Sequence, residues 1–292
     1  MPSSMPSFAT RVAAETLRLL PRKGLSRGLG RVASSGATRA LLDRAIAAYV
    51  RAYDVDMNDA VVPPGGFRSF DEFFTRPLRP GARPLAGDER TLVSPADGKV
   101  ESAGPIRAGA TYRVKDHDYS VHELLGEDGA RFEGGRFAIV YLSPRDYHRV
   151  HAAATGPVTS ARHVGGTLLP VNAFGVRAYP NLFARNERVV VFQDTDAGEV
   201  ATIMVGAVGV GRISLSFDPT IMTNVGRAPT TVRYDAGRGP RLARGDELGK
   251  FHLGSTAIVL TTPEVGAELD VASGQTVRMG AALARARERG MS

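Results

Sequence analysis

The most informative absence from this 292-residue chain is cysteine, which does not occur at all. Disulfide crosslinks, thiolate catalysis and cysteine-held zinc or iron–sulfur sites are therefore excluded. The chain also contains no run of ~20 apolar residues of the kind that spans a membrane, and its first residues lack the uninterrupted apolar core of a secretory signal. We therefore expect a protein that is not translocated and that stays on the cytoplasmic side.

The remaining composition indicates a globular protein rich in strands and turns. Hydrophobic residues make up 43% of the chain, which is enough for a sizeable core in one large domain or two ordinary ones. The 33 glycines and 18 prolines are scattered rather than periodic. This pattern favours short strands and many turns over long helices.

All of the excess positive charge lies in the first 51 residues. This segment has nine basic residues and two acidic ones, Glu15 and Asp43, so its net charge is +7. The net charge of the whole chain is also +7. Apolar residues in the same segment recur at helical spacing; they are Phe8, Val12, Leu19 and Leu20, followed by Leu42, Ile46, Tyr49 and Val50. We expect residues 1–60 to form basic amphipathic helices. These either lie on an anionic membrane surface or pack on the body of the protein with their arginines in water.

From residue 61 onward the pattern changes to short β-branched runs bounded by turn residues, which are typical of buried strands. The clearest runs are Phe137–Leu142, Val189–Phe192, Thr202–Val205 and Thr256–Leu260. Helical patterns are few there, chiefly Phe70–Arg76 and Val121–Leu125. We predict an α+β protein with a mostly antiparallel β body, sandwich- or barrel-like, and N-terminal amphipathic helices.

The residues Leu253–Thr256 and Tyr147–His151 together suggest a serine that attacks its own backbone. Glycine has no Cβ, so Gly254 can adopt a strained conformation that brings the Ser255 hydroxyl to the preceding carbonyl. A serine hydroxyl is a weak nucleophile at neutral pH and needs a neighbouring base, usually a histidine oriented by a carboxylate. The segment from Tyr147 to His151 supplies two histidines, and the orienting carboxylate stays open between Asp97 and Asp146.

Five segments resemble the bacterial type of phosphatidylserine decarboxylase proenzyme, and they occur in that family's order. They are FDEFFTR (70–76), SPADGKV (94–100), LSPRDYHRVH (142–151), PNLFARNER (180–188) and GKFHLGST (249–256). Each motif is weak alone, because short motifs recur by chance, but five in register make a specific match.

The resemblance implies that Asp97, His151 and Ser255 carry out a self-cleavage. His151 would withdraw the Ser255 proton while Asp97 holds the imidazole tautomer. Cleavage between Gly254 and Ser255 would give a β chain, 1–254, and an α chain, 255–292, with Ser255 converted to a covalent pyruvoyl cofactor.

The resemblance further implies the conversion of phosphatidylserine to phosphatidylethanolamine and CO2 within a decarboxylase domain, 61–292. The pyruvoyl carbonyl would form a Schiff base with the substrate amine and accept the electrons released with CO2, which no protein side chain can do. His148 is the candidate acid that protonates the resulting carbanion. The enzyme would be a peripheral protein on the cytoplasmic face of the cell membrane and a homodimer of cleaved protomers.

Two other functions are compatible with the same residues. An Asp–His–Ser set could hydrolyse an external ester, although Ser255 lacks the G-x-S-x-G elbow. A non-catalytic protein could bind anionic lipids through the basic segment 1–60. Neither nucleic acid nor metal is expected, since the segment has no nucleic-acid-binding motif. His117, His122 and His163 also lack metal-ligand spacing.

Overall fold

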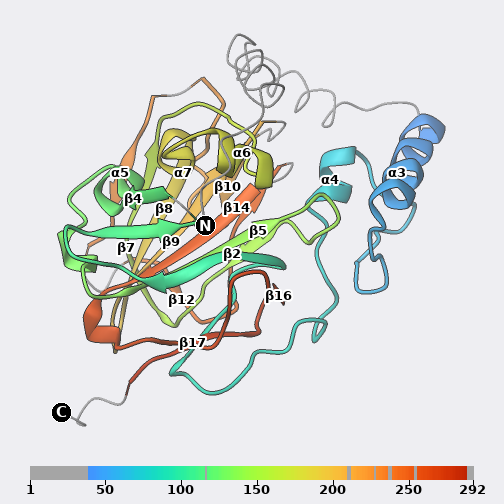
Figure 1. The fold of residues 1–292 in the computed structure, drawn as a ribbon. Helices are drawn as coiled ribbons and strands as arrows, with labels where there is room; N and C mark the ends of the chain where they lie inside the picture. Colours follow the sequence, from blue (N-terminus) through green and yellow to red (C-terminus); the bar gives the residue numbers. More distant parts are fainter. Residues whose placement is uncertain are drawn as a thin grey trace.

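The computed structural model describes residues 39–287, except for residues 116, 209–211, 227, 236–238 and 253–254. The first predicted amphipathic face, from Phe8 to Leu20, lies outside the described residues. The described part contains one large antiparallel sheet, with the helices α3 and α4 set to one side of it (Figure 1). This arrangement confirms the predicted α+β class.

The large sheet has nine strands in the described part of the chain, in the order β11-β7-β8-β9-β14-β5-β2-β16, with β12 also paired to β7. Its strands are β2 (Gly98–Pro105), β5 (Arg136–Leu142), β7 (Gly156–Val164), β8 (Arg188–Thr195), β9 (Gly198–Gly206), β11 (Thr231–Arg233), β12 (Arg241–Leu242), β14 (Ser255–Thr261) and β16 (Thr276–Val277). The four predicted strands are confirmed as β5, β8, β9 and β14. The strand order has two ends, so the sheet is open.

Three smaller sheets complete the β structure of the described residues. Their orders are β10-β13-β6, β1-β17-β15 and β3-β4. The strands are β1 (Thr91–Val93), β3 (Thr111–Val114), β4 (His117–Ser120), β6 (Arg149–His151), β10 (Ile213–Leu215), β13 (Glu247–Phe251), β15 (Glu268–Leu269) and β17 (Ala282–Arg285). The β10-β13-β6 sheet matters most for function, because the chain passes from its strand β13 towards β14.

The helices are short apart from α3 (Arg39–Tyr53). The others are α4 (Phe70–Phe74), α5 (Val121–Leu125), α6 (Ala173–Ala178) and α7 (Leu182–Arg185), with 3-10 turns η1 (Ala130–Phe132) and η2 (Pro263–Val265). The prediction for α5 is confirmed, and α4 ends two residues before the predicted Arg76. The pattern analysis did not identify α6 and α7, because helices of one or two turns are too short to display an amphipathic period.

The second predicted amphipathic face is confirmed as one side of α3, and it packs on the protein itself. Ile46, Tyr49 and Val50 contact a cluster that includes the buried Phe73 and Phe74 of α4. The Tyr49 hydroxyl also donates to the Pro144 carbonyl at 3.0 Å. For residues 39–53, packing on the body is therefore the observed arrangement.

The core is divided between the two faces of the large sheet, and β14 contributes to both. Side chains alternate across a strand, so Ile258 and Leu260 enter one apolar cluster while Ala257 enters another. Every residue of β14 is buried. The sequence of a strand that is buried on both faces is a nearly continuous run of apolar residues. This run is the pattern from which β14 was predicted.

Asn186 ties this core to the end of β9. Its side-chain oxygen accepts from the Leu169 amide at 2.9 Å, and its side-chain nitrogen donates to the carbonyls of Leu169, at 2.9 Å, and Gly206, at 2.8 Å. The Asn186 side chain is completely buried. One side-chain amide therefore bonds to three main-chain groups in the core, of which the Leu169 carbonyl also accepts from the Val208 amide at 3.4 Å.

We predict that Asn186→Ala destabilises the protein by about 1–3 kcal/mol for each main-chain group left without a partner. Urea unfolding at one protein concentration measures the loss. Asn58→Ala is the control, since Asn58 is exposed, and it should leave the urea midpoint unchanged. Equal midpoints for the two variants would contradict this role of Asn186.

Candidate functional site

Ser255 is the first residue of β14 and is held by strands on both sides. It is paired with Leu142 of β5 and with Gly206 of β9. Its side chain is buried, and its Oγ has no hydrogen-bond partner among the described residues. A buried hydroxyl normally makes a hydrogen bond, so the Ser255 Oγ, like the neighbouring Thr256 Oγ1, keeps its hydrogen-bonding capacity free in the described part of the chain.

The backbone just before Ser255 joins two different sheets. Phe251 ends β13, where it pairs with Ile213 of β10, and Ser255 begins β14 in the large sheet. Leu253 and Gly254 lie outside the described residues. The predicted scissile bond between Gly254 and Ser255 therefore falls where the chain crosses between two separately anchored strands.

His148 lies beside this crossing. Its carbonyl accepts from the Phe251 amide at 3.0 Å, and its ring contacts the Phe74 ring of α4 at a centroid distance of 4.0 Å. The His148 Nδ1 donates to the Asp146 carbonyl at 2.7 Å. Its Nε2 is buried and has no partner among the described residues, so this nitrogen carries an unused lone pair.

Burial keeps the His148 ring neutral. Loss of solvation, together with the positive charge of Arg76, lowers the pKa of His148 to about 3, and the bond to the Asp146 carbonyl opposes this only in part. A neutral imidazole with a free Nε2 can accept a proton from a neighbouring group. A negative charge nearby favours the protonated ring, and the imidazolium can then donate its Nε2 proton to a stronger base.

His151 follows on strand β6 and already uses both of its ring nitrogens. Its Nδ1 donates to the Gly245 carbonyl at 2.7 Å, so Nε2 accepts from the Tyr147 hydroxyl at 3.1 Å. Burial lowers the pKa of His151, although the Gly245 carbonyl and the charges of Glu247 and Asp97 partly oppose this. The ring is a neutral base whose tautomer is held by a main-chain carbonyl.

Asp97 lies close to His151 but is hydrogen-bonded elsewhere. The His151 amide donates to the Pro95 carbonyl in the turn that carries Asp97. The Asp97 carboxylate accepts from Arg83 Nε at 2.9 Å and Nη2 at 2.7 Å, and from the Met279 amide at 2.8 Å. It therefore acts on His151 as a nearby negative charge rather than as a direct hydrogen-bond acceptor.

Asp146, the other carboxylate that the sequence left open, has a different task. Its Oδ2 accepts from the amide and the hydroxyl of Ser143, at 2.7 and 2.6 Å. These bonds close the turn between β5 and β6 that carries His148. The Asp146 carbonyl, not its carboxylate, orients a histidine ring.

Several groups at this site were missed by the sequence analysis. Arg83 and the Met279 amide hold Asp97, and Gly245 holds His151, yet they lie far from these partners in the sequence. No local pattern reports such contacts. Asp71 is the exception, because it lies in the quoted motif 70–76, and the structure places its carboxylate 2.8 Å from His252 Nδ1.

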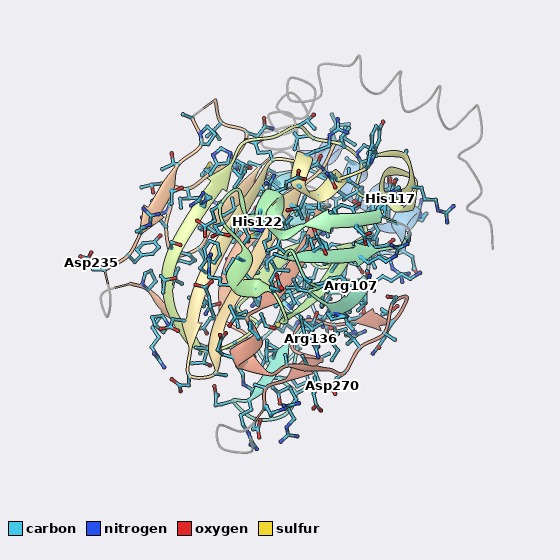
Figure 2. The ribbon with its side chains drawn as sticks, turned by 60° about the vertical axis from the view of Figure 1, so that its left-hand side comes forward. Arg107, His117, His122, Arg136, Asp235 and Asp270 are labelled. Carbon is cyan, nitrogen blue, oxygen red and sulfur yellow. The ribbon has the colours of Figure 1, made fainter. Side chains whose placement is uncertain are left out.

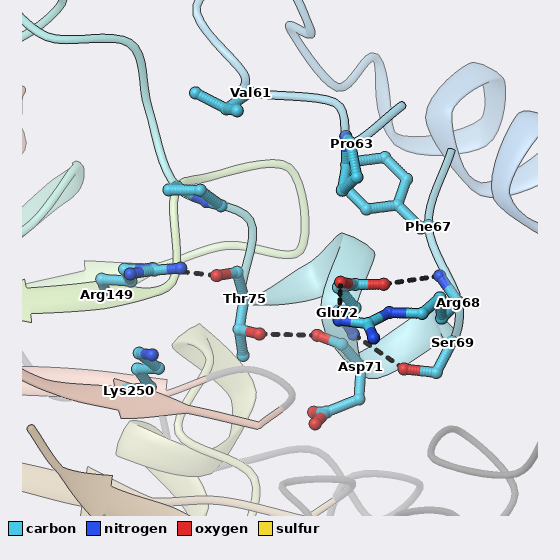
Figure 3. Close-up of a pocket in the computed structure, with 11 residues that line it drawn as sticks. Val61, Pro63, Phe67, Arg68, Ser69, Asp71, Glu72, Thr75, Arg149 and Lys250 are labelled. Carbon is cyan, nitrogen blue, oxygen red and sulfur yellow. Dashed lines mark hydrogen bonds and ion pairs between the residues drawn. The ribbon is translucent and has the colours of Figure 1, made fainter. Parts of the chain in front are cut away.

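A cavity of about 540 Å³ opens on the other side of α4 (Figure 3). Val61 and Phe67 are among its apolar lining residues. Charges of both signs lie in its wall, from Arg68, Arg149 and Lys250 and from Asp71 and Glu72. The Arg149 guanidinium donates to the Thr75 carbonyl and pairs with Glu247. The short helix α4 therefore contacts His148 and also lines the cavity. The volume of the cavity is sufficient for a polar group with a short apolar extension.

The remaining histidines form no metal site. His117 on β4 and His122 on α5 lie apart (Figure 2), α5 is at the opposite edge of the body from α4 in Figure 1, and His163 is paired with Glu187 at 2.8 Å. In the described ranges no group of three or more metal-binding side chains occurs. In the described part of the chain, no helix is both long enough and apolar enough to cross a membrane.

The sequence of the chain matches known proteins over almost its whole length. A family model described as phosphatidylserine decarboxylase matches residues 70–285. A protein of Pseudomonas aeruginosa strain PAO1, named phosphatidylserine decarboxylase proenzyme, is 46% identical over 285 residues, which is 95% of this chain and 98% of the relative.

Proteins of the same name in other organisms also match this chain. The relative in Bordetella avium strain 197N is 42% identical over 95% of this chain and 96% of its own length. The relative in Anaeromyxobacter sp. strain K is 42% identical over 92% of this chain and 96% of its own length. The matched range includes Asp97, His148, His151 and Ser255. The chain belongs to the phosphatidylserine decarboxylase family.

Proposed function

We propose that this chain decarboxylates phosphatidylserine to phosphatidylethanolamine and CO2, with a pyruvoyl group that it makes from its own Ser255. The observation that carries the proposal is the lone, buried Ser255 hydroxyl at the start of a central strand. Membership of the family supports the activity, and the proenzyme name of the relatives supports self-cleavage.

We infer that Ser255 and His148 suit a pyruvoyl group at position 255. The Ser255 Oγ and the His148 Nε2 are both buried and both without partners in the described part of the chain. A carbonyl oxygen at the Ser255 position would accept a hydrogen bond, and a protonated His148 could donate one. When formed, the pyruvoyl carbonyl supplies the electron sink that decarboxylation of an amino acid requires.

Self-cleavage begins when His151 takes the Ser255 proton, with Asp97 as the negative charge that stabilises the imidazolium. The Ser255 Oγ then bonds to the Gly254 carbonyl carbon, the peptide C–N bond breaks, and an ester replaces the amide. Elimination of the ester leaves Gly254 as a carboxylate and residue 255 as a dehydroalanine. Addition of water and loss of ammonia complete the pyruvoyl group. To act in this way, His151 must exchange its bond with Tyr147 for one with Ser255.

In the decarboxylation itself we assign the protonation step to His148. Its ring is held by Asp146 and Phe74, so the free Nε2 has a defined direction. A substrate phosphate or carboxylate would favour the protonated ring and raise its pKa from the low value set by burial. We assign the phosphate of the lipid headgroup to the cavity beside α4, where it would compete with Glu247 for Arg149 and Lys250.

We further propose that the N-terminal segment brings the enzyme to an anionic membrane surface on the cytoplasmic face. Residues 1–38 carry six basic residues against Glu15. Leu41, Val61 and Val62 are exposed beside the α3–α4 unit, where apolar side chains can enter a lipid surface. The homodimer of cleaved protomers rests on family membership alone.

The first prediction concerns the intact mass of the purified protein under denaturing conditions. We expect two chains, one ending at Gly254 and one beginning with a pyruvoyl group at residue 255. Ser255→Ala should give one uncut chain that releases no CO2 from phosphatidylserine, because it has neither the nucleophile nor the cofactor.

The conservative control is Thr256→Ala, which removes the neighbouring hydroxyl and should still be cut. A single wild-type chain of full mass would support the hydrolase or the lipid-binding alternative. An uncut Ser255→Ala protein that still decarboxylated the lipid would refute the proposed mechanism.

The second prediction is a pH profile for self-cleavage. Because burial lowers the pKa of His151 below its ordinary value of 6.5, the ring is in its basic, neutral form at pH 7. The rate of cleavage should therefore stay near its plateau between pH 8 and 7 and fall at a lower pH than for a base with the ordinary histidine pKa, as His151 becomes protonated. Loss of full-length chain after synthesis in a cell-free system measures this rate.

His148→Gln serves as the control in the same assay. We expect it to be cut with the same pH profile and to have lost decarboxylation, since His148 is assigned to the later reaction. A wild-type rate that falls between pH 8 and 7 would contradict the lowered pKa of His151.

The third prediction concerns vesicle binding. Deletion of residues 1–38 should weaken binding to anionic vesicles while self-cleavage continues, because each basic residue near the surface contributes about 1 kcal/mol. The deletion spares α3, whose apolar face packs on α4. Cosedimentation with vesicles containing phosphatidylglycerol, compared with neutral phosphatidylcholine vesicles, measures the difference. Equal binding by both proteins to the anionic vesicles would contradict the role of this segment.

A further inference from the structure

His252, two residues before the predicted scissile bond, has contacts on every polar atom of its side chain. Its Nδ1 lies 2.8 and 2.9 Å from the two Asp71 carboxylate oxygens, and its Nε2 lies 3.0 Å from Ser214 Oγ. Its main-chain amide donates to the Arg212 carbonyl at 2.9 Å. A carboxylate only accepts hydrogen bonds, so Nδ1 carries a proton and donates it to Asp71.

The three side chains converge from separate elements. Asp71 lies in the first turn of α4, Ser214 is the middle residue of β10, and His252 follows β13. Gly249 allows β13 to approach β10, because a Cβ at that position would lie 2.5 Å from the Ser214 carbonyl oxygen. Contacts that join elements so far apart in sequence hold the end of β13 in one place.

The electrostatics favour an ionised Asp71. Burial alone would raise the pKa of Asp71, but the hydrogen bond from His252 and the charges of His252, Arg212 and Lys250 outweigh it and lower the pKa. Arg212 Nη2 lies 3.5 Å from the Asp71 carboxylate. The side chains of His252 and Asp71 are only 11% and 16% exposed, so water weakens their interaction little.

We propose that Asp71, Ser214 and His252 form a positioning latch that holds the upstream end of the scissile bond for attack by Ser255. The downstream end is already fixed, since Ser255 is paired with Leu142 and Gly206. Attack on a carbonyl requires that both ends be held within a fraction of an ångström, and the latch supplies the second anchor. This inference rests on the proposed self-cleavage.

The contacts of the latch would remain after the scissile bond is cut. All three of its residues belong to the segment that would become the β chain, 1–254. After cleavage they retain the new C-terminal end, and its Gly254 carboxylate, next to residue 255. Without these side-chain contacts, this end would be held by the pairing of β13 with β10 and β6 and by the main-chain bonds of Phe251 to His148 and of His252 to Arg212.

The test is the rate of self-cleavage of the full chain, followed after cell-free synthesis at pH 7.5. We expect His252→Leu to slow cleavage by about 100-fold, the effect of a misplacement of about 1 Å at a reacting centre. His252→Asn should recover most of the rate, because the Asn amide nitrogen can replace Nδ1 as the donor to Asp71. A merely structural histidine would not show this recovery.

A double variant tests the coupling. If Asp71 acts through His252, His252→Leu with Asp71→Asn should be no slower than His252→Leu alone. His122→Leu is the matched control, since His122 also lies beside a carboxylate, Asp128, at 3.2 Å, but on the distant helix α5. It should be cut at the wild-type rate.

The outcomes separate the latch from the proposed function. If the wild-type chain is cut and His252→Leu is cut equally fast, the latch is wrong while the proposed function stands. If the wild-type chain is not cut at all, both fall. Labelling of Ser214 by a fluorophosphonate would also overturn the latch, because Ser214, His252 and Asp71 would then act as a hydrolase triad.

Discussion

The hydrogen bonds that hold β14 between β5 and β9 are the constraint on which the site depends. They fix all seven residues of the strand on both sides, from Ser255 to Thr261. A strand that is buried on both faces cannot slip by one residue without moving its apolar side chains out of the core. The position of Ser255 is therefore set by the same packing that stabilises the fold. Asn186 extends this control, because it holds the Gly206 carbonyl beside Ser255.

Around that fixed serine, burial decides the protonation states. Both histidines of the motif 142–151 are removed from water, and the pKa of each is lowered for that reason first. Their hydrogen bonds then give them different characters. His151 is saturated by Gly245 and Tyr147, whereas His148 keeps a free Nε2. We propose that these two histidines, three residues apart, serve two different proton transfers, and His151 must first give up its bond with Tyr147.

The short helix α4 links the parts that the reaction must coordinate. It packs on α3 through Phe73 and Phe74, on His148 through Phe74, and on His252 through Asp71. It also lines the cavity that we assign to the headgroup. Only the five residues of α4 therefore lie between α3 and the ring of His148. The capping bond from Glu72 to Ser69 keeps this helix formed despite its length.

The sequence by itself determined the α+β class, the four central strands, the amphipathic face of residues 42–50 and the family, because these depend on local periodicity and contiguous motifs. It also identified Ser255, His148 and His151 as candidates. It could not determine which groups hold them. Asp97 is bonded to Arg83 and Met279 rather than to His151, and His252 is bonded to Asp71, 181 residues away. Such partners are set by the crossing of sheets and by desolvation, which arise only when distant segments pack together, and no short-range pattern encodes them.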